Sequence, residues 1–570
     1  MKLNYGPKFS ISKEIHADKY RQSNESFEEG MERIANALGD NKEHKEEFLD
    51  CLLNQRFLPA GRIQSAMGAK RIVTPYNCFV SGTIEDNSES IMHRAGQAFQ
   101  TMRLGGGIGY DFSTLRPRGD VIKSLESYSS GPLSFMEIFD AVCGTVSSAG
   151  HRRGAQMGVL RIDHPDIEDF IKSKNNTSKF SNFNISVAVT DHFMDCLNRG
   201  IPFPLTFGGK IYRYVDPSYL WNLLMKSTWD WAEPGILFID RINWKNNLYY
   251  CETISATNPC AEQPLPPFGA CLLGSFNLVK YINTELKEFD YKLFTTDIFT
   301  CYAAMDNVID VATYPLKEQE LEAKNKRRMG LGVTGLANAL EYLGYFYGSS
   351  EFLIEMEGIF EVLRDTTYVA SMKRAKEKGT FPLYDKKILA SNFIRKLPTW
   401  LLKDIEKYGL RNSHLLSIAP TGTISLSADN VSSGIEPVFS LHYDRTIREF
   451  DGERTERVED YGYHYWGVKG KTTDKVTVKE HVDVLCLASK YVDSAVSKTC
   501  NIGDNVSYEE FKSVYLDAYN GGASGCTTFR SAGKRNGILN VAHPSDSIEQ
   551  GVEQGTACFI DPETGRKTCD

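Results

Sequence analysis

Hydrophobic positions in residues 1–70 recur at the spacing of an α-helix. The positions that share one helical face are Met31, Ile34, Ala35 and Leu38. Just before them, Ser26 and Glu29 have the spacing of a capping box, in which each side chain satisfies a backbone N–H at the start of a helix. The sequence therefore predicts that residues 1–70 are mainly helical.

From about residue 71 the pattern changes to short apolar runs that are separated by longer helical stretches. The runs are RIVTPYNCFV, MGVLRI, FNISVAV and HLLSIAP, and the helical stretches include 86–103 and 315–348. Strands that alternate with helices in this way are typical of an α/β sheet or barrel. We therefore expect one α/β unit over residues 71–540.

Residues 541–570 differ from the rest of the chain in composition. They have few large apolar side chains and many Gly, Ser, Glu and Asp residues, and they include Cys558 and Cys569. A segment of this composition is expected to form a flexible tail.

The overall composition is that of a globular chain, with 570 residues of which 41% are hydrophobic and 24% are charged. The net charge of −8 argues against a surface that wraps nucleic acid, although it allows a local basic pocket for a phosphate. No apolar run is long enough to span a bilayer, and residues 1–20 are too polar for a signal peptide. We therefore expect a cytoplasmic protein with no nucleic-acid partner and no membrane contact.

The chain has 13 cysteines, and in a reducing compartment these favour redox or nucleophilic roles over a disulfide framework. No CxxC pair occurs, and neither a zinc site nor another metal site is predicted. Several cysteines have apolar neighbours and are expected simply to pack in the core. They are Cys51, Cys143, Cys196, Cys301 and Cys486.

The densest chemical motif is Asn258-Pro259-Cys260-Ala261-Glu262, with Cys271 eleven residues after Cys260. If the motif is extended, the amide, the thiol and the carboxylate at positions 258, 260 and 262 share one face. A thiol can donate a hydrogen atom or an electron, a carboxylate can act as a general base, and an amide can hold a hydroxyl. Taken alone, the motif also fits an ordinary turn, in which the amide caps, the thiol packs and the carboxylate faces solvent.

Two glycine-containing loops are candidates for phosphate or nucleotide contacts. The first offers hydroxyls and backbone N–H groups to an anion, and a helix that began just after it would add a favourable partial charge. It comprises Pro420, Thr421, Gly422, Thr423, Ile424 and Ser425. The second suits a mobile loop that contacts a base or a phosphate through two arginines, and it comprises Gly150, His151, Arg152, Arg153 and Gly154. In isolation, each loop also fits a plain turn.

These motifs occur in one order along the chain. NPCAEQPLPPFGACLLGSFNL resembles the finger loop of ribonucleotide reductases, and PYNCFV resembles their strand with the other redox cysteine. GGGIG and LRPRG resemble the glycine-rich stretch and first specificity loop, and SAGHRRGA resembles the second specificity loop. APTGTIS resembles the substrate-phosphate loop, and GCTTFR resembles the closing barrel strand. The resemblance covers roughly 55–535 and is most specific to the adenosylcobalamin-dependent class II enzymes.

The resemblance implies a ten-stranded α/β barrel with a central finger loop, preceded by the small helical N-terminal region. It implies that Cys260 becomes a thiyl radical that removes the 3′-hydrogen of the ribose, with Glu262 as the base and Asn258 on the ribose hydroxyls. Cys78 and Cys271 would supply two electrons as the 2′-hydroxyl leaves as water. The implied cofactor is adenosylcobalamin, and the implied substrate is a ribonucleoside di- or triphosphate.

The resemblance also implies regulatory parts. Arg116 and Arg118 fall in the first specificity loop, within a helical effector and dimer region at about 86–143. Asp86 and Arg116 are candidate contacts of a dNTP or ATP effector. The region before the match is too short for an ATP-cone, and a homodimer is compatible with the implied fold.

The two tail cysteines are expected to reset the enzyme. Cys558 and Cys569 would reduce the disulfide of the barrel cysteines and would themselves be reduced by a thioredoxin- or glutaredoxin-type protein. Their alternative role is that of two exposed thiols without a redox function.

Two other functions stay open. A class I large subunit would receive its radical from a separate protein through a tyrosine pair near the end of the barrel, but GCTTFRSAGKRNG has no such pair. A nucleotide-binding regulatory protein could keep the fold without catalysis, but the intact set of motif residues argues against it.

Overall fold

The computed structural model of the chain describes residues 5–146, 155–175, 179–449, 452–503, 505–530 and 533, together with the short strands β22 (Phe559–Ile560) and β23 (Lys567–Thr568). Of residues 445–449, 452–455, 559–560 and 567–568 only the backbone conformation is described. The second predicted specificity loop, 150–154, and the predicted tail cysteines Cys558 and Cys569 lie outside the described residues.

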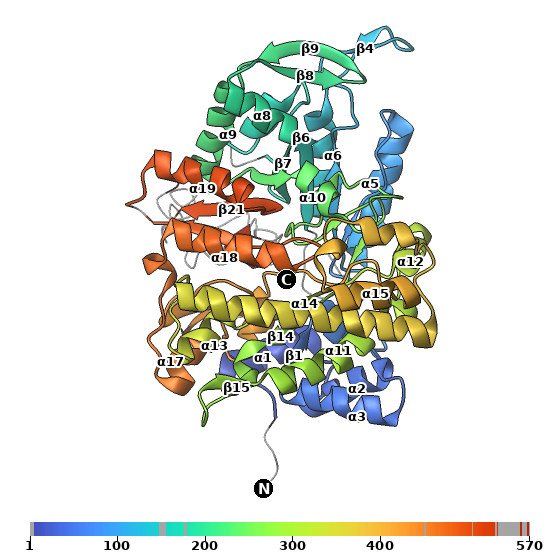
Figure 1. Cartoon of the computed structure of the whole chain (residues 1–570). Coiled ribbons are helices and arrows are strands. Elements are labelled where there is room, and N and C mark those ends of the chain that lie inside the picture. Colours follow the sequence, from blue (N-terminus) through green and yellow to red (C-terminus); the bar gives the residue numbers. More distant parts are fainter. Residues whose placement is uncertain are drawn as a thin grey trace.

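An eight-stranded sheet occupies the centre of the fold (Figure 1). From one edge to the other its strands are β13 (Ala270–Cys271), β2 (Cys78–Val80), β3 (Gly107–Asp111), β6 (Gln156–Arg161), β7 (Phe183–Val189), β10 (Gly235–Phe238), β21 (Gly525–Arg530) and β20 (Thr499–Ile502). The strands from β2 to β10 run parallel, whereas β13 pairs antiparallel with β2 and β21 pairs antiparallel with β10.

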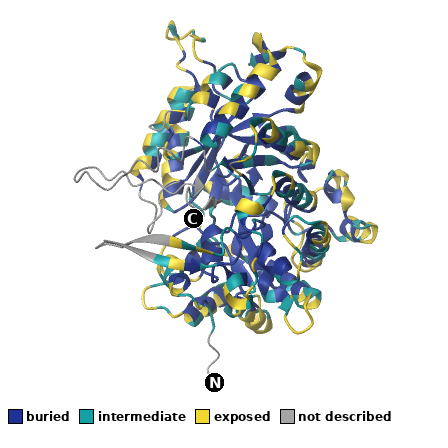
Figure 2. Cartoon of the chain, turned by 90° about the vertical axis from the view of Figure 1, so that its left-hand side faces the viewer, coloured by how far each residue is buried: buried dark blue, intermediate teal, exposed yellow. Residues whose placement is uncertain are grey.

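Alternating side chains of this sheet enter two different hydrophobic cores. On β7, Ile185, Val187 and Val189 belong to one core. Ala188, which lies between Val187 and Val189, points to the other face and belongs to the other core. Parallel sheets are usually buried on both faces because helices cover them, and Figure 2 shows the buried strands inside and exposed residues along the outer helices. The sheet therefore separates an outer core from an inner core.

Helices enclose the two cores on opposite sides of the sheet. The outer core contains side chains of α5 (Ser88–Arg103), α6 (Pro132–Thr145), α8 (Asp191–Arg199), α9 (Pro217–Trp231) and α19 (Tyr508–Asn520). The inner core contains side chains of α2 (Phe27–Leu38), α3 (Lys42–Leu53), α11 (Tyr291–Val311), α13 (Leu336–Tyr342) and α14 (Ser350–Lys378). Helix α18 (Val478–Tyr491) contributes to both cores and lies beside α14 in the middle of Figure 1.

The N-terminal helices pack onto the inner core instead of forming a core of their own. Ile34 and Phe48 belong to the same hydrophobic cluster as Phe276, which lies in a strand far along the chain. The predicted capping box is confirmed, since Glu29 N donates to Ser26 Oγ at 3.1 Å and Ser26 N donates to Glu29 Oε2 at 2.7 Å. Two further helices of this region, α1 (Ser10–Tyr20) and α4 (Gly61–Ala66), contact each other.

A second sheet of three strands adjoins the inner core. It comprises β1 (Phe57–Pro59), which is antiparallel to β14 (Leu273–Asn277), and β17 (Gly330–Thr334), which is parallel to β14. Single bridges join Leu331 to Leu416 and Ile418 to Val496. The two sheets establish a mixed α/β fold, and the ten-stranded barrel with a central finger loop stays a prediction.

Two elements differ from the predictions. The stretch 315–348 is not continuously helical, because the buried strand β17 separates α12 (Lys317–Lys326) from α13. HLLSIAP forms single bridges and no strand. Close approach of two backbones explains both differences, since a Cβ on Gly332 would lie 2.3 Å from Ser417 O. The spacing of apolar residues along a short stretch of sequence carries no information about such long-range packing.

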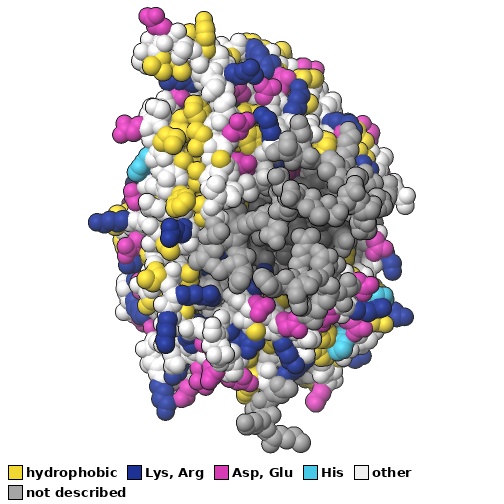
Figure 3. Space-filling view, turned by 180° about the vertical axis from the view of Figure 1, so that it is seen from behind, with side chains coloured by type: hydrophobic (Ala, Val, Ile, Leu, Met, Phe, Trp, Pro, Cys, Tyr) yellow, Lys and Arg dark blue, Asp and Glu magenta, His cyan; other side chains and the backbone are white. Residues whose placement is uncertain are grey.

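Basic and acidic side chains intermingle over the described part of the surface shown in Figure 3. Their totals are close, with 65 Lys and Arg against 73 Asp and Glu residues. In the described ranges, no helix is both long enough and apolar enough to cross a membrane.

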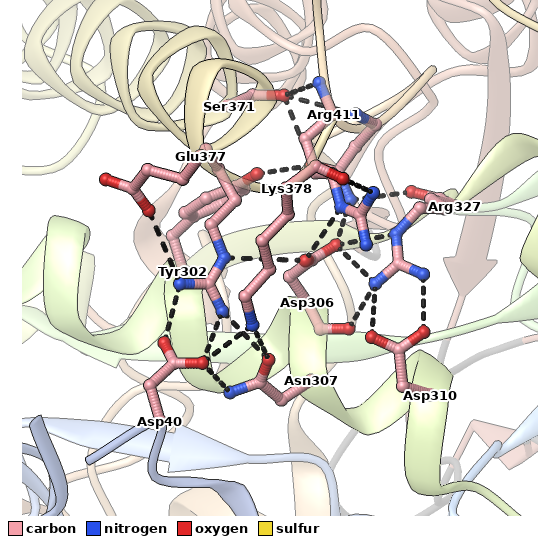
Figure 4. A network of polar contacts seen from close by, with 12 residues as sticks. Asp40, Tyr302, Asp306, Asn307, Asp310, Arg327, Ser371, Glu377, Lys378 and Arg411 are labelled. Carbon is pink, nitrogen blue, oxygen red and sulfur yellow. Dashed lines mark hydrogen bonds and ion pairs between the residues drawn. The ribbon is translucent and has the colours of Figure 1, made fainter. Parts of the chain in front are cut away.

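A buried carboxylate joins helices from distant parts of the chain (Figure 4). Asp306 of α11 has a fully buried side chain and accepts hydrogen bonds from Arg327 Nε at 2.9 Å and Arg411 Nε at 3.3 Å. Arg374 of α14 lies 3.7 Å from Asp306 and forms a 2.6 Å ion pair with Asp40, which follows α2. Buried charges are tolerated when each has opposite charges and hydrogen bonds around it. The network thus ties the N-terminal helices to α11 and α14.

We expect Asp306→Asn to lower the free energy of unfolding by about 3–5 kcal/mol, because it leaves buried arginines without a compensating charge. Chemical denaturation followed by circular dichroism measures the change. Asp310→Asn is the matched control, since the Asp310 side chain is 46% exposed and also pairs with Arg327. We expect its loss to cost at most about 1 kcal/mol. Equal destabilisation by both variants would contradict the central place of Asp306.

Candidate active site

The motif at 258–262 forms the tip of a hairpin. Strand β11 (Ala256–Thr257) pairs antiparallel with β12 (Pro264–Leu265), and Ala261 adopts a left-handed conformation with φ of 65°. The extended conformation considered for 258–262 is therefore wrong, because the chain reverses direction within the motif. The turn nevertheless unites the polar side chains, since Asn258 Nδ2 donates to Glu262 Oε1 at 2.8 Å.

This finger hairpin, residues 256–265, is held at its backbone by two segments from later in the chain. Ser417 Oγ donates to Glu262 O at 2.8 Å, and Ala495 N donates to the same oxygen at 3.0 Å. The main chain next to the carboxylate is thus fixed by two hydrogen bonds from different segments. Such support restricts where the side chain of Glu262 can reach.

The finger hairpin also packs directly on the main sheet. Asn184 Nδ2 of β7 donates to Pro259 O at 3.3 Å. A Cβ on Gly109 of β3 would lie 1.8 Å from Thr257 O, and a Cβ on Gly107 would lie 3.2 Å from Pro259 Cγ. The first approach is closer than any side chain permits, so the hairpin can occupy this place only against a glycine.

Two buried cysteines face each other across neighbouring strands. Cys271 of β13 lies directly opposite Cys78 of β2. Directly opposed residues of antiparallel strands have Cα atoms about 4.5–5.5 Å apart, within the range that a disulfide spans. Burial, Glu262 and Cys78 hold the pKa of Cys271 well above its usual value, so its thiol stays protonated at neutral pH.

A cavity of about 470 Å³ brings most of the predicted residues together. The predicted residues in its lining are Cys78, Cys260, Glu262, Pro420, Thr421, Thr423 and Ile424. Asn258 and Cys271 lie behind this lining, where Asn258 Nδ2 approaches Cys271 Sγ at 3.9 Å. Cys260 is 3% exposed and disulfide-bonded in this structure, so a free thiol at this position requires reduction.

The predicted phosphate loop continues into a short helix, α16 (Gly422–Leu426). Two of its hydroxyls are used within the protein. Thr334 Oγ1 of β17 is hydrogen-bonded to Thr421 Oγ1 at 2.9 Å and to Ser425 Oγ at 2.7 Å. These buried hydroxyls hold the loop against the sheet, and both Thr421 and Thr423 line the cavity.

The cavity also has a polar wall that the sequence analysis did not identify. Lys19, Arg62 and Arg71 come from the N-terminal region and from the segment before β2. Asn77 also lines the cavity, and its buried Oδ1 has no hydrogen-bond partner among the described residues. The position of Asn77 next to Cys78 was a usable signal, whereas nothing local marked the three basic residues.

The sequence can now be compared with known proteins. Residues 76–464 and 454–529 match the family described as "Ribonucleotide reductase, barrel domain". The chain belongs to the ribonucleotide reductase family. It is 32% identical, over 94% of its length and 78% of the relative, to the "Vitamin B12-dependent ribonucleoside-diphosphate reductase" of Mycobacterium tuberculosis. The protein of the same name from Thermoplasma acidophilum is 32% identical over 90% of this chain and 69% of the relative.

A relative with a different name matches less of this reductase. The "Ribonucleoside-diphosphate reductase subunit alpha" of Chlamydia pneumoniae is 26% identical over 64% of the chain and 40% of the relative. The chain is therefore similar over a much greater length to the relatives that are named as vitamin B12-dependent.

The reductase has a second cavity that also reaches the motif cysteine. Among the described residues, Cys260 is the only one that lines both cavities. The polar residues of this second lining include Ser186, Glu233 and Ser497. Cys260 thus lies where two separate spaces meet.

The remaining predicted residues of the reductase lie away from these cavities or outside the described residues. Arg116 Nε forms a 2.6 Å ion pair with Asp86 Oδ2, and Arg118 N donates to Asp166 Oδ2 at 2.8 Å. In the tail, the backbone of β23 contacts helix α16 of the phosphate loop. Within the described ranges, no three His, Cys, Asp or Glu side chains lie close enough together to hold a metal ion.

We expect Gly109→Ala to displace the finger hairpin of the reductase, because the added Cβ cannot coexist with Thr257 O at 1.8 Å. The free energy of unfolding should fall by about 1–3 kcal/mol, as in other overpacked sites, and activity should fall much further. Gly96→Ala in α5 is the control, because its Cβ would meet nothing within 4 Å. That variant should keep full activity and gain about 0.5–1 kcal/mol. Unchanged activity in Gly109→Ala would contradict the proposed packing constraint.

Proposed function

We propose that the chain reduces ribonucleoside diphosphates to 2′-deoxyribonucleoside diphosphates by radical chemistry that depends on adenosylcobalamin. One observation carries this proposal: a single cavity is lined by Cys260, Glu262, Cys78 and the loop at Pro420–Ile424. A nucleotide in that cavity has a thiol, a carboxylate, a reducing thiol and an anion-binding loop around it. The names of the relatives at 32% identity support the diphosphate as the substrate.

The proposed first step occurs at the tip of the finger hairpin. Cys260, as a thiyl radical, takes the 3′-hydrogen atom of the ribose, and Glu262 accepts the proton of the 3′-hydroxyl. Asn258 orients Glu262 through the 2.8 Å hydrogen bond. Its proposed contact with the ribose hydroxyls requires the nucleotide to reach behind the present cavity lining. Cys260 and Glu262 are 3% and 1% exposed, and such burial protects a radical from quenching by solvent.

The proposed second step uses the opposed cysteine pair. The 2′-hydroxyl accepts a proton and leaves as water, while the thiols of Cys78 and Cys271 supply two electrons and two hydrogens and become a disulfide. Cys260 then returns the 3′-hydrogen atom to the product. The net reaction converts one ribonucleotide and one dithiol into one deoxyribonucleotide, one disulfide and one water. The raised pKa of Cys271 supports this role, because a protonated thiol carries the hydrogen that the reduction consumes.

The second cavity adjoins Cys260, and its volume of about 60 Å³ admits only one end of the proposed cofactor. Adenosylcobalamin, when bound, supplies the organic radical that removes a hydrogen atom from a thiol. Ser186, Glu233 and Ser497 would hold its adenosyl group through polar contacts next to Cys260. This position lies apart from the substrate cavity, so the cofactor and the nucleotide would not compete for one space.

We also propose roles for the predicted residues that lie outside the two cavities. Asp86, Arg116 and Arg118 would respond to a dNTP or ATP effector, and loop 150–154 would contact the substrate base. Cys558 and Cys569 would pass electrons from a thioredoxin- or glutaredoxin-type protein to the barrel cysteines. The contact between β23 and α16 supports a tail that reaches the cavity. A homodimer is the proposed assembly.

We expect Cys260→Ser to abolish turnover. The O–H bond of serine is too strong for an organic radical to remove its hydrogen atom, so no radical forms at position 260. Deoxynucleotide formation is measured anaerobically with adenosylcobalamin, a nucleoside diphosphate and dithiothreitol. Cys251→Ser is the matched control, since Cys251 is an exposed free cysteine and the variant should retain wild-type activity. If the wild-type chain turned over only after a second protein was added, the class I large subunit would be the better assignment.

The tail cysteines are tested by changing the reductant. Cys558→Ser should keep turnover within about twofold when dithiothreitol reduces the barrel disulfide directly. Its turnover with thioredoxin and thioredoxin reductase should fall by at least about tenfold, because the relay is interrupted. Equal losses with both reductants would argue against a relay through the tail.

A further inference from the structure

A cavity of about 640 Å³ shares no lining residue with the two cavities at Cys260. Its lining comes from α10 (Ile239–Lys245), α14, α18, the segment 393–396 and the turn after α19. None of the lining residues belongs to the motifs or to the reaction described above. Its volume is within the range of about 300–1,000 Å³ that is typical of small-molecule sites.

Three cations line this cavity and form no ion pair within 4.0 Å among the described residues. They are Arg241, Lys245 and Lys396. The two acidic residues of the lining pair with other lysines. Glu357 pairs with Lys490, a fourth cation of the same lining, at 2.6 Å, and Asp483 pairs with Lys479 at 2.6 Å. The cavity therefore presents an excess of positive charge.

Lys245 is the most constrained of the three cations. It is 7% exposed, and the single hydrogen bond of its ammonium group, among the described residues, goes to Ser489 O at 3.3 Å. An ammonium group has three N–H donors, so two remain for a ligand. Burial, together with Lys396 and Arg241, lowers the pKa of Lys245 to about 7. An anion between these groups would compensate for both the burial and the mutual repulsion.

Apolar and aromatic side chains complete the lining. Trp244 is 52% exposed, and Lys396 Nζ lies 5.3 Å from the centre of its ring. Phe393 is buried, and Ile354 of α14 is 71% exposed at the rim. Exposed aromatic and aliphatic groups beside a cationic cluster suit a ligand that has a flat ring as well as a negative charge.

We propose that this cavity is a second ligand site that binds a nucleoside phosphate. The phosphate contacts Arg241, Lys245 and Lys396, and the ring lies against Trp244. The proposal does not depend on the reaction at Cys260, because it rests on a separate set of residues.

The position of Lys245 connects the site to the finger hairpin. Asp493 is the acidic group whose charge acts on Lys245. Its carboxylate accepts hydrogen bonds from Leu415 N at 2.7 Å and Leu416 N at 2.9 Å, just before Ser417, which holds Glu262 O. Neutralising Lys245 with a bound phosphate therefore changes the charge next to a segment that supports the catalytic hairpin.

Photolabelling of the full chain with 8-azido-ADP, followed by peptide mapping, tests the proposal. We expect label on peptides that contain 239–245 or 393–396, and excess ADP should reduce this label by at least about tenfold. Excess pyrophosphate or adenosine alone should protect less than ADP, because each provides only half of the contacts. Absence of label from both peptides would overturn the proposal, and so would protection by adenosine equal to that by ADP.

Charge variants assign the label to the cations. Arg241→Gln together with Lys396→Gln should reduce labelling of these peptides by at least about tenfold, since charge-assisted hydrogen bonds are lost. Arg241→Lys, which keeps the charge, should stay within about threefold of wild type. Lys42→Gln is the control, because the Lys42 side chain is 89% exposed and far from the cavity lining. Undiminished label in the double variant would overturn the proposal.

The substrate cavity supplies an internal reference. Label on peptides that contain 62–78 or 419–425 reports on nucleotide binding next to Cys260 and should be the same in the double variant and in wild type. In the wild-type chain, absence of label from 62–78 and 419–425 alone would count against the proposed function. Absence of label from 239–245 and 393–396 alone in the wild-type chain would count against the second site. Equal melting temperatures of the variants establish that the fold is retained.

Discussion

The close contact between the finger hairpin and strand β3 is the constraint on which the active site depends. The carbonyl of Thr257 lies where the side chain of any residue other than glycine at 109 would project. Because the hairpin can lie this deep, its tip places Cys260 in two cavities and Glu262 beside the opposed cysteines. Hydrogen bonds from Ser417 and Ala495 then fix the hairpin from the opposite side.

The cavity that Cys260 and Glu262 line with the predicted phosphate loop is assembled from parts that are far apart in the sequence. The N-terminal region contributes Lys19 and Arg62 to the wall opposite the motif residues. That region is held in place by apolar packing on the inner core and by the ion pair between Asp40 and Arg374 next to Asp306. This buried charge network therefore helps to maintain the shape of the cavity, although none of its residues lines the cavity.

Side-chain hydroxyls in the predicted phosphate loop differ in their contacts. Thr421 and Ser425 bond to Thr334 and anchor the loop, and Thr421 and Thr423 line the cavity. An anion that binds at the loop would contact a main chain that is already rigid. The loop would therefore lose little conformational freedom on binding. The same principle applies to Asn258, whose contact with Glu262 orients the proposed base before a nucleotide binds.

The sequence alone was enough to predict the family and to locate its motifs in order along the chain. The motif around Cys260, the cysteines at 78 and 271, the loop after Ala419 and the capping box at Ser26 were all identifiable because they are local or have a family-specific spacing. The family comparison and the α/β class agree with that prediction.

Only the tertiary structure decided how these parts meet. It replaced an extended motif by a turn, inserted strand β17 into a stretch that looked helical, and turned two loop hydroxyls toward Thr334. It also brought Lys19, Arg62 and Arg71 to the cavity and gathered Arg241, Lys245 and Lys396 around another. The physical reason is the same in each case. Contacts between distant strands, and charges that come together from separate helices, do not change the spacing of residue types within a local stretch of sequence.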